Sequence, residues 1–211
     1  MKKVKFLLII FLVLSVIKGV NAQDNEPRAK YLNLNYMKAT MKEEGYKVKS
    51  DYSMGLTAGR TFYVHKNPLA GMIRIGIDWS YLDLNFSQFS ENYYHDDVDD
   101  YISEEWKTYK IEAGMHVGPS VTVSPVKNLH LNAYFRFAPS YSGMTDSEFS
   151  DVSSAYASFY VAGTSVSYSI ISLGLENRWG TTKYKGNYDG ESYDYEIKMS
   201  GPRFYVGFRF K

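Results

Sequence analysis

Apolar and polar side chains alternate with a period of two along most of the chain. The clearest run places Ile73, Ile75, Ile77, Trp79 and Tyr81 at every second position, with polar residues or Gly between them. Successive side chains of a β-strand point to opposite faces, so this period predicts a strand with one apolar and one polar face. Eight segments share the pattern: residues 30–37, 53–64, 73–81, 109–118, 129–138, 155–167, 171–178 and 203–210. The pattern leaves the register of the sixth and seventh segments open.

Long polar connections alternate with short ones between these segments. The connections after the first, third, fifth and seventh segments are long and polar, at about 42–51, 86–106, 142–154 and 187–196. The other connections are short. Transmembrane barrels of antiparallel strands have short periplasmic turns and longer external loops. The chain is therefore predicted to be all-β, an eight-stranded antiparallel up-and-down transmembrane β-barrel over residues 30–211, with both termini in the periplasm.

An export signal is predicted at the N-terminus. Three lysines precede residues 6–17, which are apolar except for one Ser, and a Val-Asn-Ala sequence ends at Ala22. This layout is typical of a secretory signal peptide over residues 1–22. The apolar run is too short for a transmembrane helix, which needs roughly 20 residues. Gln23 stands where a lipoprotein would have its acylated Cys, and residues 23–29 are expected to form a short polar tail.

The composition agrees with a barrel and excludes several other classes. The chain has 20 Tyr, 12 Phe and 3 Trp, and aromatic residues favour pleated surfaces. The absence of Cys excludes disulfides, and the formal net charge of +1 gives no indication of nucleic-acid binding. No second long apolar run follows the export signal. A chain of this kind can span a membrane only as a closed barrel, because lipid offers no partners for backbone polar groups.

The polar faces of the segments decide which side of the barrel meets lipid. A soluble lipocalin-like barrel has the same alternation, with its apolar side chains inside. Here charges of both signs are interleaved with Gly, Ser and Asn, which favours a lumen of paired charges over a water-exposed surface. An eight-stranded barrel is only wide enough to be filled by side chains. The predicted lumen ion-pair network consists of Arg74, Asp78, Glu112, Arg136, Glu176 and Arg178. Glu112 is expected to pair with Arg74 or Arg136 from neighbouring strands.

Few residues suggest chemistry. His65, His95, His116 and His130 are dispersed and match no metal-binding or catalytic motif. The acidic segment 86–106 carries carboxylates that suit a hard cation such as calcium, but its spacing does not match an EF-hand. A solvated acidic loop is the preferred interpretation. No catalytic, cofactor or metal site is predicted, and the chain is not expected to be an enzyme.

The last strand is aromatic. Phe204, Val206, Phe208 and Phe210 alternate with polar or small residues, apart from Tyr205, up to the C-terminal Lys211. Together with the export signal and the strand pattern, this ending resembles the small outer-membrane β-barrel proteins, similar to the transmembrane domain of outer-membrane protein A. The resemblance covers the whole mature chain. It implies a location in the cell outer membrane, contact with its lipid and lipopolysaccharide, and recognition of the last strand by the outer-membrane assembly machinery. Such proteins typically end on Phe, whereas here Phe210 is penultimate.

Two classes of function remain open. A filled lumen favours a structural or surface-interaction role, with the extracellular ligand unknown. The alternative is a narrow porin-like transport channel. A lipid-modifying outer-membrane enzyme is less favoured, since the sequence has neither a His-x-Ser pair nor a GxSxG motif.

Overall fold

The computed structural model describes residues 27–43, 46–94, 103–147, 152–188 and 191–211. Regular structure in these ranges is β-strand throughout. The strands are β1 (Lys30–Met37), β2 (Thr40–Glu43), β3 (Tyr46–Tyr63), β4 (Ile73–Tyr94), β5 (Ser103–Val126), β6 (Leu129–Asp146), β7 (Val152–Tyr168), β8 (Ile171–Tyr188) and β9 (Glu191–Phe210). Among the described residues, no helix has the length and apolar character needed to cross a membrane. The predicted signal peptide at 1–22 lies outside the described residues.

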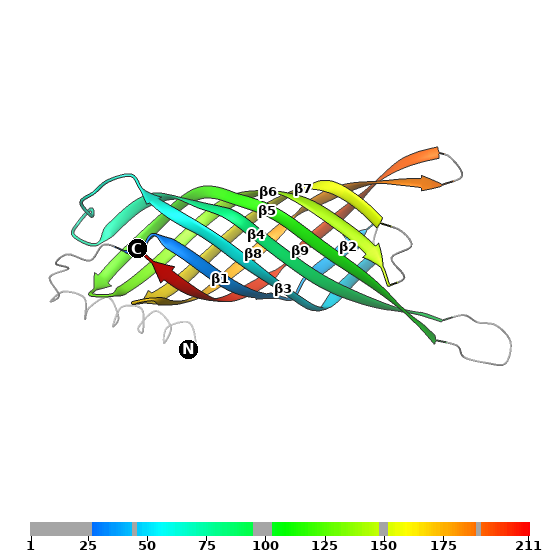
Figure 1. Cartoon of the computed structure of the whole chain (residues 1–211), viewed down its shortest axis with the longest axis horizontal. Coiled ribbons are helices and arrows are strands. Elements are labelled where there is room, and N and C mark those ends of the chain that lie inside the picture. Colours follow the sequence, from blue (N-terminus) through cyan, green and yellow to red (C-terminus); the bar gives the residue numbers. More distant parts are fainter. Residues whose placement is uncertain (1–26, 44–45, 95–102, 148–151, 189–190) are drawn as a thin grey trace, which may run out of the picture.

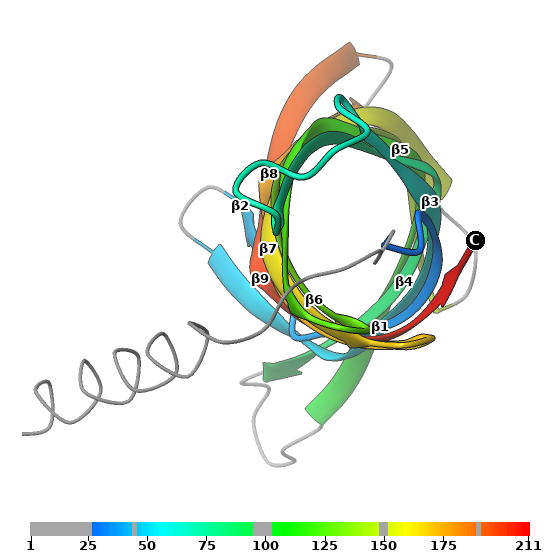
Figure 2. The same cartoon turned by 90° about the vertical axis from the view of Figure 1, so that its left-hand side faces the viewer.

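The strands form one closed antiparallel ring. From β2 to β9 each strand pairs with the next one in the chain, and β1 closes the circle by pairing with both β3 and β9, as the view down the barrel shows (Figure 2). Strands β1 and β2 both lie between β3 and β9. They are therefore two parts of one position in the wall, and the ring has eight positions. The predicted all-β antiparallel barrel is confirmed.

The two ends of the barrel differ. The turn end carries the start of β1, the end of β9 and the tight turns between β5 and β6 and between β7 and β8 (Figure 1). Asn128 and Ser169 adopt positive φ angles of 64° and 55° in these turns, the left-handed conformation that two-residue hairpins use. At the opposite end, which we call the far end, the β4–β5 and β8–β9 ribbons project beyond the ring (Figure 1).

The strands are longer than the sequence pattern predicted. The expected loops at 42–51, 86–106, 142–154 and 187–196 are largely strand, and only residues within them at 44–45, 95–102, 148–151 and 189–190 lie outside the described residues. The prediction of long loops was therefore wrong. Near the far end the alternation has the opposite sense, with apolar side chains such as Val48 and Ile197 facing inwards and polar ones such as Lys47 and Lys198 facing outwards, so these stretches do not continue the apolar outer face. The backbone ladder continues, because its hydrogen bonds do not depend on apolar side chains.

A break in the first wall position lies between β1 and β2. The Lys38 amide donates to the Pro202 carbonyl oxygen at 3.2 Å. The Ala39 amide donates to the Ser50 hydroxyl at 2.9 Å, and the Ser50 amide donates to the Ala39 carbonyl oxygen at 2.8 Å. The Ser50 side chain thus supplies a partner where the regular ladder is interrupted, and the wall stays satisfied at the break.

A β-bulge in β4 changes which residues face the lumen. Tyr81 and Leu82 together oppose Met115, where the register of β4 and β5 shifts. Two residues against one reverse the alternation beyond the bulge. Before it Asp78 points inwards, and after it Asp83 does so as well, five positions further along. The bulge therefore brings two carboxylates of one strand into the same lumen.

Burial across the wall is the reverse of that in a soluble protein. Ile77 is 50% exposed, whereas its neighbour Asp78 is 0% exposed. On β8, Leu173 is 60% exposed and Ser172 is 1% exposed. Large apolar side chains of this kind cover the outer face of every wall position, far beyond the few hundred Å² of apolar patch normal for a protein surface in water. Such a surface is suited to hydrocarbon.

Arginine at the middle of this outer face should be costly. Val117 points outwards from β5, between Trp79 and Phe137 on the adjacent strands. We expect Val117→Arg to lower the free energy of unfolding in lipid vesicles by about 2–4 kcal/mol, because the charge would lie near the bilayer midplane. Urea titration followed by tryptophan fluorescence measures the change.

Ile75 provides the matched control for this substitution. It also faces outwards but lies close to the start of β4 at the turn end. The cost of Ile75→Arg should fall to about 0–1 kcal/mol, since charges are tolerated near the interface. Equal small costs at both positions would contradict contact between this face and lipid.

Candidate functional site: the filled lumen

Charged side chains of both signs fill the middle of the lumen. Eight of them, each at most 3% exposed, form what we call the lumen network: Asp78, Asp83, Lys110, Glu112, Arg136, Glu176, Arg178 and Arg203. They come from β4, β5, β6, β8 and β9. Four are acidic and four are basic, so the network balances its own charge. Balance matters here, because an unpaired charge away from water is very costly.

Glu176 joins two arginines inside the lumen. The Arg203 Nε donates to Glu176 Oε2 at 2.7 Å, and Nη1 of Arg136 lies 3.5 Å from Glu176 Oε1. Arg136 also places its Nε 3.1 Å from Asp78 Oδ1. The chain of contacts runs from β9 through β8 and β6 to β4. Arg203 and Glu176 lie opposite each other on paired strands, whereas the β8–β6 and β6–β4 contacts tie together wall positions that share no backbone hydrogen bonds.

Asp83 is the second anchor of Arg203. The Arg203 Nη1 donates to Asp83 Oδ1 at 3.1 Å, and His116 Nε2 lies 3.0 Å from Asp83 Oδ2. The Thr57 hydroxyl and the Asn85 amide each donate to Asp83 at 2.6 Å. Both carboxylate oxygens are thus fully engaged. This is the condition under which a buried charge pair is tolerated.

Tyrosines complete the hydrogen bonding of the other carboxylates. Tyr134 donates to Glu176 at 2.6 Å, and Tyr31 donates to Asp78 at 2.5 Å. The Arg136 guanidinium lies 3.7 Å from the centre of the Tyr134 ring, a cation–π contact. Gly163 makes room for that ring, since a Cβ there would approach it within 2.7 Å. The glycines on the polar faces therefore serve the packing of the lumen.

A second cluster lies closer to the far end. Glu112 accepts a hydrogen bond from Arg178 at 2.6 Å and lies 3.1 Å from the Lys110 ammonium. The Arg178 guanidinium stacks on Phe159, 3.5 Å from the ring centre. Beyond this cluster the lumen is apolar, with Phe89, Phe159, Tyr184, Ile197 and Met199 among the buried side chains packed together. The network is thus closed at the far end by an apolar layer.

The expected partners of Glu112 were wrong. Glu112 contacts Arg178 and Lys110 rather than Arg74 or Arg136. The register explains the difference, because Glu112 lies opposite Ser142 on β6, whereas Arg74 on β4 lies opposite Thr122 much nearer the turn end. Adjacent strands alone do not bring two side chains together when their positions along the strands differ.

Five of the six residues predicted for the network lie in it, and Arg74 does not. The Arg74 Nη1 donates to the Lys66 carbonyl oxygen at 2.7 Å, beside the turn. The sequence analysis left Asp83, Lys110 and Arg203 out of the network. Asp83 could have been found from the change in alternation between Tyr81 and Leu84, which requires a bulge. Lys110 and Arg203 already stood on predicted polar faces.

The turn end of the lumen holds a small polar cavity. Its volume is about 10 Å³, and Tyr63, His130, Asn132 and Arg209 are among its lining residues. That is room for roughly one water molecule. The Ser124 hydroxyl lies 2.8 Å from His130 Nδ1, but among the described residues no carboxylate forms an ion pair with His130. The pair therefore lacks the third group that orients a catalytic histidine.

The described residues offer no evident metal site. No group of three or more His, Cys, Asp or Glu within them could hold a metal ion. This statement does not cover the whole acidic segment at 86–106, because residues 95–102 are not described. The interpretation of that segment as a solvated acidic loop stays a prediction.

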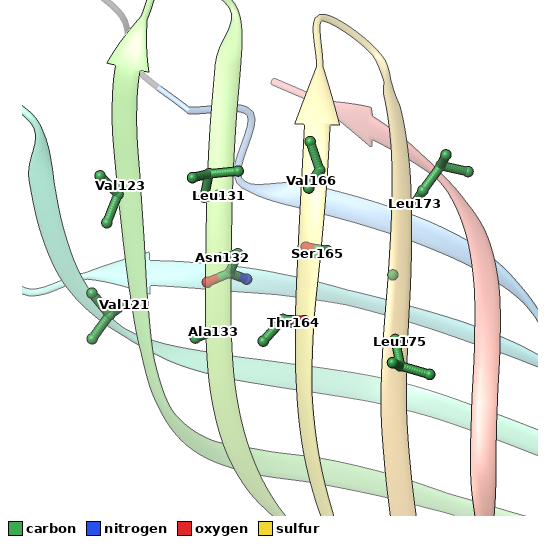
Figure 3. A pocket seen from close by; sticks show the side chains of 11 residues that line it. Val121, Val123, Leu131, Asn132, Ala133, Thr164, Ser165, Val166, Leu173 and Leu175 are labelled. Atoms are coloured by element: carbon green, nitrogen blue, oxygen red, sulfur yellow. The ribbon is translucent and has the colours of Figure 1, made fainter. Parts of the chain in front are cut away.

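A larger depression lies on the outer face of the wall. Its volume is about 520 Å³, and its apolar rim comes from four neighbouring strands, β5 to β8. Figure 3 shows these side chains: Val121, Val123, Leu131, Ala133, Thr164, Val166, Leu173 and Leu175. The short Ala133 and Thr164 lie between longer neighbours, which produces the hollow. Its chemistry suits hydrocarbon, not a polar ligand.

A double-mutant cycle tests the partner of Glu112. Glu112→Ala should lower the free energy of unfolding by about 3 kcal/mol, because Arg178 and Lys110 lose their carboxylate. Combining it with Arg178→Ala should give a coupling energy of about 0.5–3 kcal/mol, measured by equilibrium unfolding in lipid vesicles. Combining it with Arg136→Ala should give nearly additive losses. A stronger coupling to Arg136 than to Arg178 would refute the pairing described above.

Comparison with known proteins identifies no family for this chain. No protein-family model matches it, and no curated protein matches it. Among solved structures, Ail, the attachment invasion locus protein of Yersinia pestis, in complex with the heparin analogue sucrose octasulfate, is 14% identical, with 87% of this chain and 99% of that chain covered and a TM-score of 0.46.

Two further solved structures are similar to the same extent. Neisserial surface protein A is 12% identical, with 88% of this chain and 100% of that chain covered and a TM-score of 0.46. The outer membrane protease OmpT of Escherichia coli is 9% identical, with 90% and 99% covered and a TM-score of 0.45. Because the sequence identities and the TM-scores are low, these similarities add no argument about function to those drawn from the structure of this chain.

Proposed function

We propose that this chain is an outer-membrane β-barrel protein with a closed lumen and a structural or surface-interaction role. The observation that carries the proposal is the reversed burial of the wall, with apolar side chains outside and paired charges inside. A water-soluble barrel would expose the charges and bury the apolar side chains. A β-barrel wall supports an outer-membrane location, because barrels of this kind occur in outer membranes.

The export signal and the last strand support the same location. The predicted signal peptide at 1–22 would deliver the chain across the inner membrane. Strand β9 exposes Phe204, Phe208 and Phe210 on the outer face. We propose that this aromatic strand is what the outer-membrane assembly machinery recognises, as the resemblance to the transmembrane domain of outer-membrane protein A implies.

The lumen network argues against a channel. Arg136, Glu176 and Arg203 bridge the lumen from three strands. An opening for a solute would require these contacts to separate, which would leave charges unpaired at a cost of about 3–5 kcal/mol each. The apolar layer beyond Glu112 offers no favourable path for an ion either. The barrel therefore has its contacts with other molecules on its surfaces.

The far end presents the surface suited to partners. Its β8–β9 ribbon is stiffened by the stacked rings of Tyr184 and Tyr195, whose centres are 5.5 Å apart. Tyr193 is 52% exposed on the same ribbon, and Trp106 is 44% exposed on β5. Aromatic side chains held on a rigid element are favourable contact groups, since little conformational entropy is lost on binding. We therefore place the surface-interaction role at this end.

Epitope tags test the location and the orientation together. Tags inserted at Asp99, Ser150 or Asp189 should bind antibody on intact cells, because the connections at the far end face outwards in the proposed orientation. Tags inserted at Asn67 or Asn128, at the turn end, should bind only after the outer membrane is permeabilised. The reverse labelling would invert the orientation, and recovery of the protein in the soluble periplasmic fraction would contradict the membrane location.

Conductance in planar bilayers separates the closed barrel from the narrow channel. The folded wild-type protein should insert without discrete current steps, because the network and the apolar layer fill the lumen. A general porin inserted under the same conditions serves as the positive control. Stable unitary currents from the wild-type protein would favour the porin-like alternative.

A further inference from the structure

Three lysines stand side by side on the outer face near the far end. Lys42 on β2 lies directly opposite Lys47 on β3 and directly opposite Lys198 on β9. All three side chains are exposed, and Lys198 is 68% exposed. Lys49 lies two positions along β3 from Lys47 and is exposed as well. We call Lys42, Lys47, Lys49 and Lys198 the lysine patch.

The direction of these side chains follows from their neighbours. Met199 belongs to the apolar layer inside the barrel, and Met41 and Val48 pack against that layer. They alternate with Lys42, Lys47, Lys49 and Lys198 along β2, β3 and β9. Because successive side chains of a strand point to opposite faces, the lysines point outwards.

Lysines in this arrangement repel one another. Like charges directly opposite each other on paired strands are destabilising. The neighbouring β8–β9 ribbon avoids this, since Lys183 lies opposite Glu196 and Lys185 lies opposite Asp194. Lys198 has a contact with Glu196 at 3.5 Å, but both groups are exposed and such a pair is weak. The patch therefore has an excess of positive charge that the adjacent ribbon does not have.

The exposed apolar side chains on the outer face of the wall form what we call the apolar belt. The position of the lysine patch relative to this belt suggests what balances the positive charge. At the same three wall positions, Tyr36 on β1 lies opposite both Met54 on β3 and Phe204 on β9, and all three are exposed on the outer face. Further towards the far end follow exposed Lys38 and then the lysine patch. An apolar surface below and cations above match a lipid with acyl chains and an anionic headgroup.

We infer that the lysine patch binds the phosphate groups of the phosphorylated glycolipid of the outer leaflet, lipopolysaccharide, with acyl chains against Tyr36, Met54 and Phe204. The inference rests on the proposed location and orientation, and it adds a specific binding site. An ammonium group is a compact charge with three rotatable donors, which suits phosphate oxygens. Continuity with the apolar belt favours a lipid over a free anion. Bound phosphate would also remove the repulsion within the patch.

Binding of purified lipopolysaccharide to the folded, full-length protein in detergent tests the site. The variant Lys42→Gln, Lys47→Gln, Lys198→Gln should bind at least about tenfold more weakly than the wild type, since each lysine near an anionic surface contributes favourably. The matched control Lys127→Gln, Lys183→Gln, Lys185→Gln removes the same charge elsewhere and should bind as the wild type does. Heat-modifiable migration on gels verifies that every variant is folded.

Two further arms identify the ligand chemistry. Dephosphorylated lipopolysaccharide should bind the wild type as weakly as the patch variant binds the intact lipid. Inorganic phosphate alone, at millimolar concentration, should not displace the lipid. Effective displacement would point to a free-anion site, and equal losses in the patch and control variants would reduce the effect to net charge. Either result overturns the inference.

The outcome is distinguishable from failure of the proposed function. One outcome is that the patch variant binds lipopolysaccharide as the wild type does, while the protein still fractionates with the outer membrane and tags at the far end still bind antibody on intact cells. That result would overturn the inference about the lysine patch alone. A protein found in the soluble periplasmic fraction overturns both.

Discussion

Glu176 holds Arg136 and Arg203 within one buried lumen, and the rest of the wall is arranged so that this contact is possible. Removing one partner from such a buried pair costs about 3–5 kcal/mol, because the other charge is left without compensation. The cost explains why each carboxylate of the lumen network also accepts hydrogen bonds from hydroxyl, amide or cationic donors. It explains too why the glycines stand on the same face. Their missing side chains provide the volume that Tyr134 and Tyr205 occupy.

The outer face follows from the same alternation. A strand that turns Asp78 inwards must turn Ile77 and Trp79 outwards. The barrel can therefore keep a charged interior only if its surroundings accept an apolar exterior, and hydrocarbon is that surrounding. The bulge at Tyr81 and Leu82 preserves this division. It reverses the alternation of β4 and so places Asp83 inside and Leu84 outside.

A closed lumen is the reason why the proposed function lies on the surfaces. The far end combines projecting ribbons, exposed aromatic side chains and the lysine patch, whereas the turn end is short and holds only a small polar cavity. Charges of opposite sign lie opposite each other on the β8–β9 ribbon and compensate one another, whereas the like charges on β9, β2 and β3 need a counter-charge from elsewhere. The first arrangement is complete in itself, and for the second we infer a bound anion.

The sequence by itself determined the class of the fold, the number of wall positions and the face of each strand. These depend on the alternation of side chains, which is a local property of the chain and is visible without any partner. The same alternation placed Asp78, Glu112, Arg136, Glu176 and Arg178 on polar faces. It did not identify the strands at the far end, where apolar side chains face inwards and polar ones outwards, so that the polar outer residues resemble a loop.

Only the tertiary structure decided which charges meet. The partner of Glu112 depends on how far β5 is displaced along β6 and on how the closed ring brings β8 near it across the lumen. Neither quantity is encoded in the period of a single strand, because closure and register belong to the whole ring. Asp83 entered the network through one extra residue in β4, and the lysine patch arose from pairing between strands that are distant in the sequence. In each case the contact is non-local, and the alternation of one strand carries no record of it.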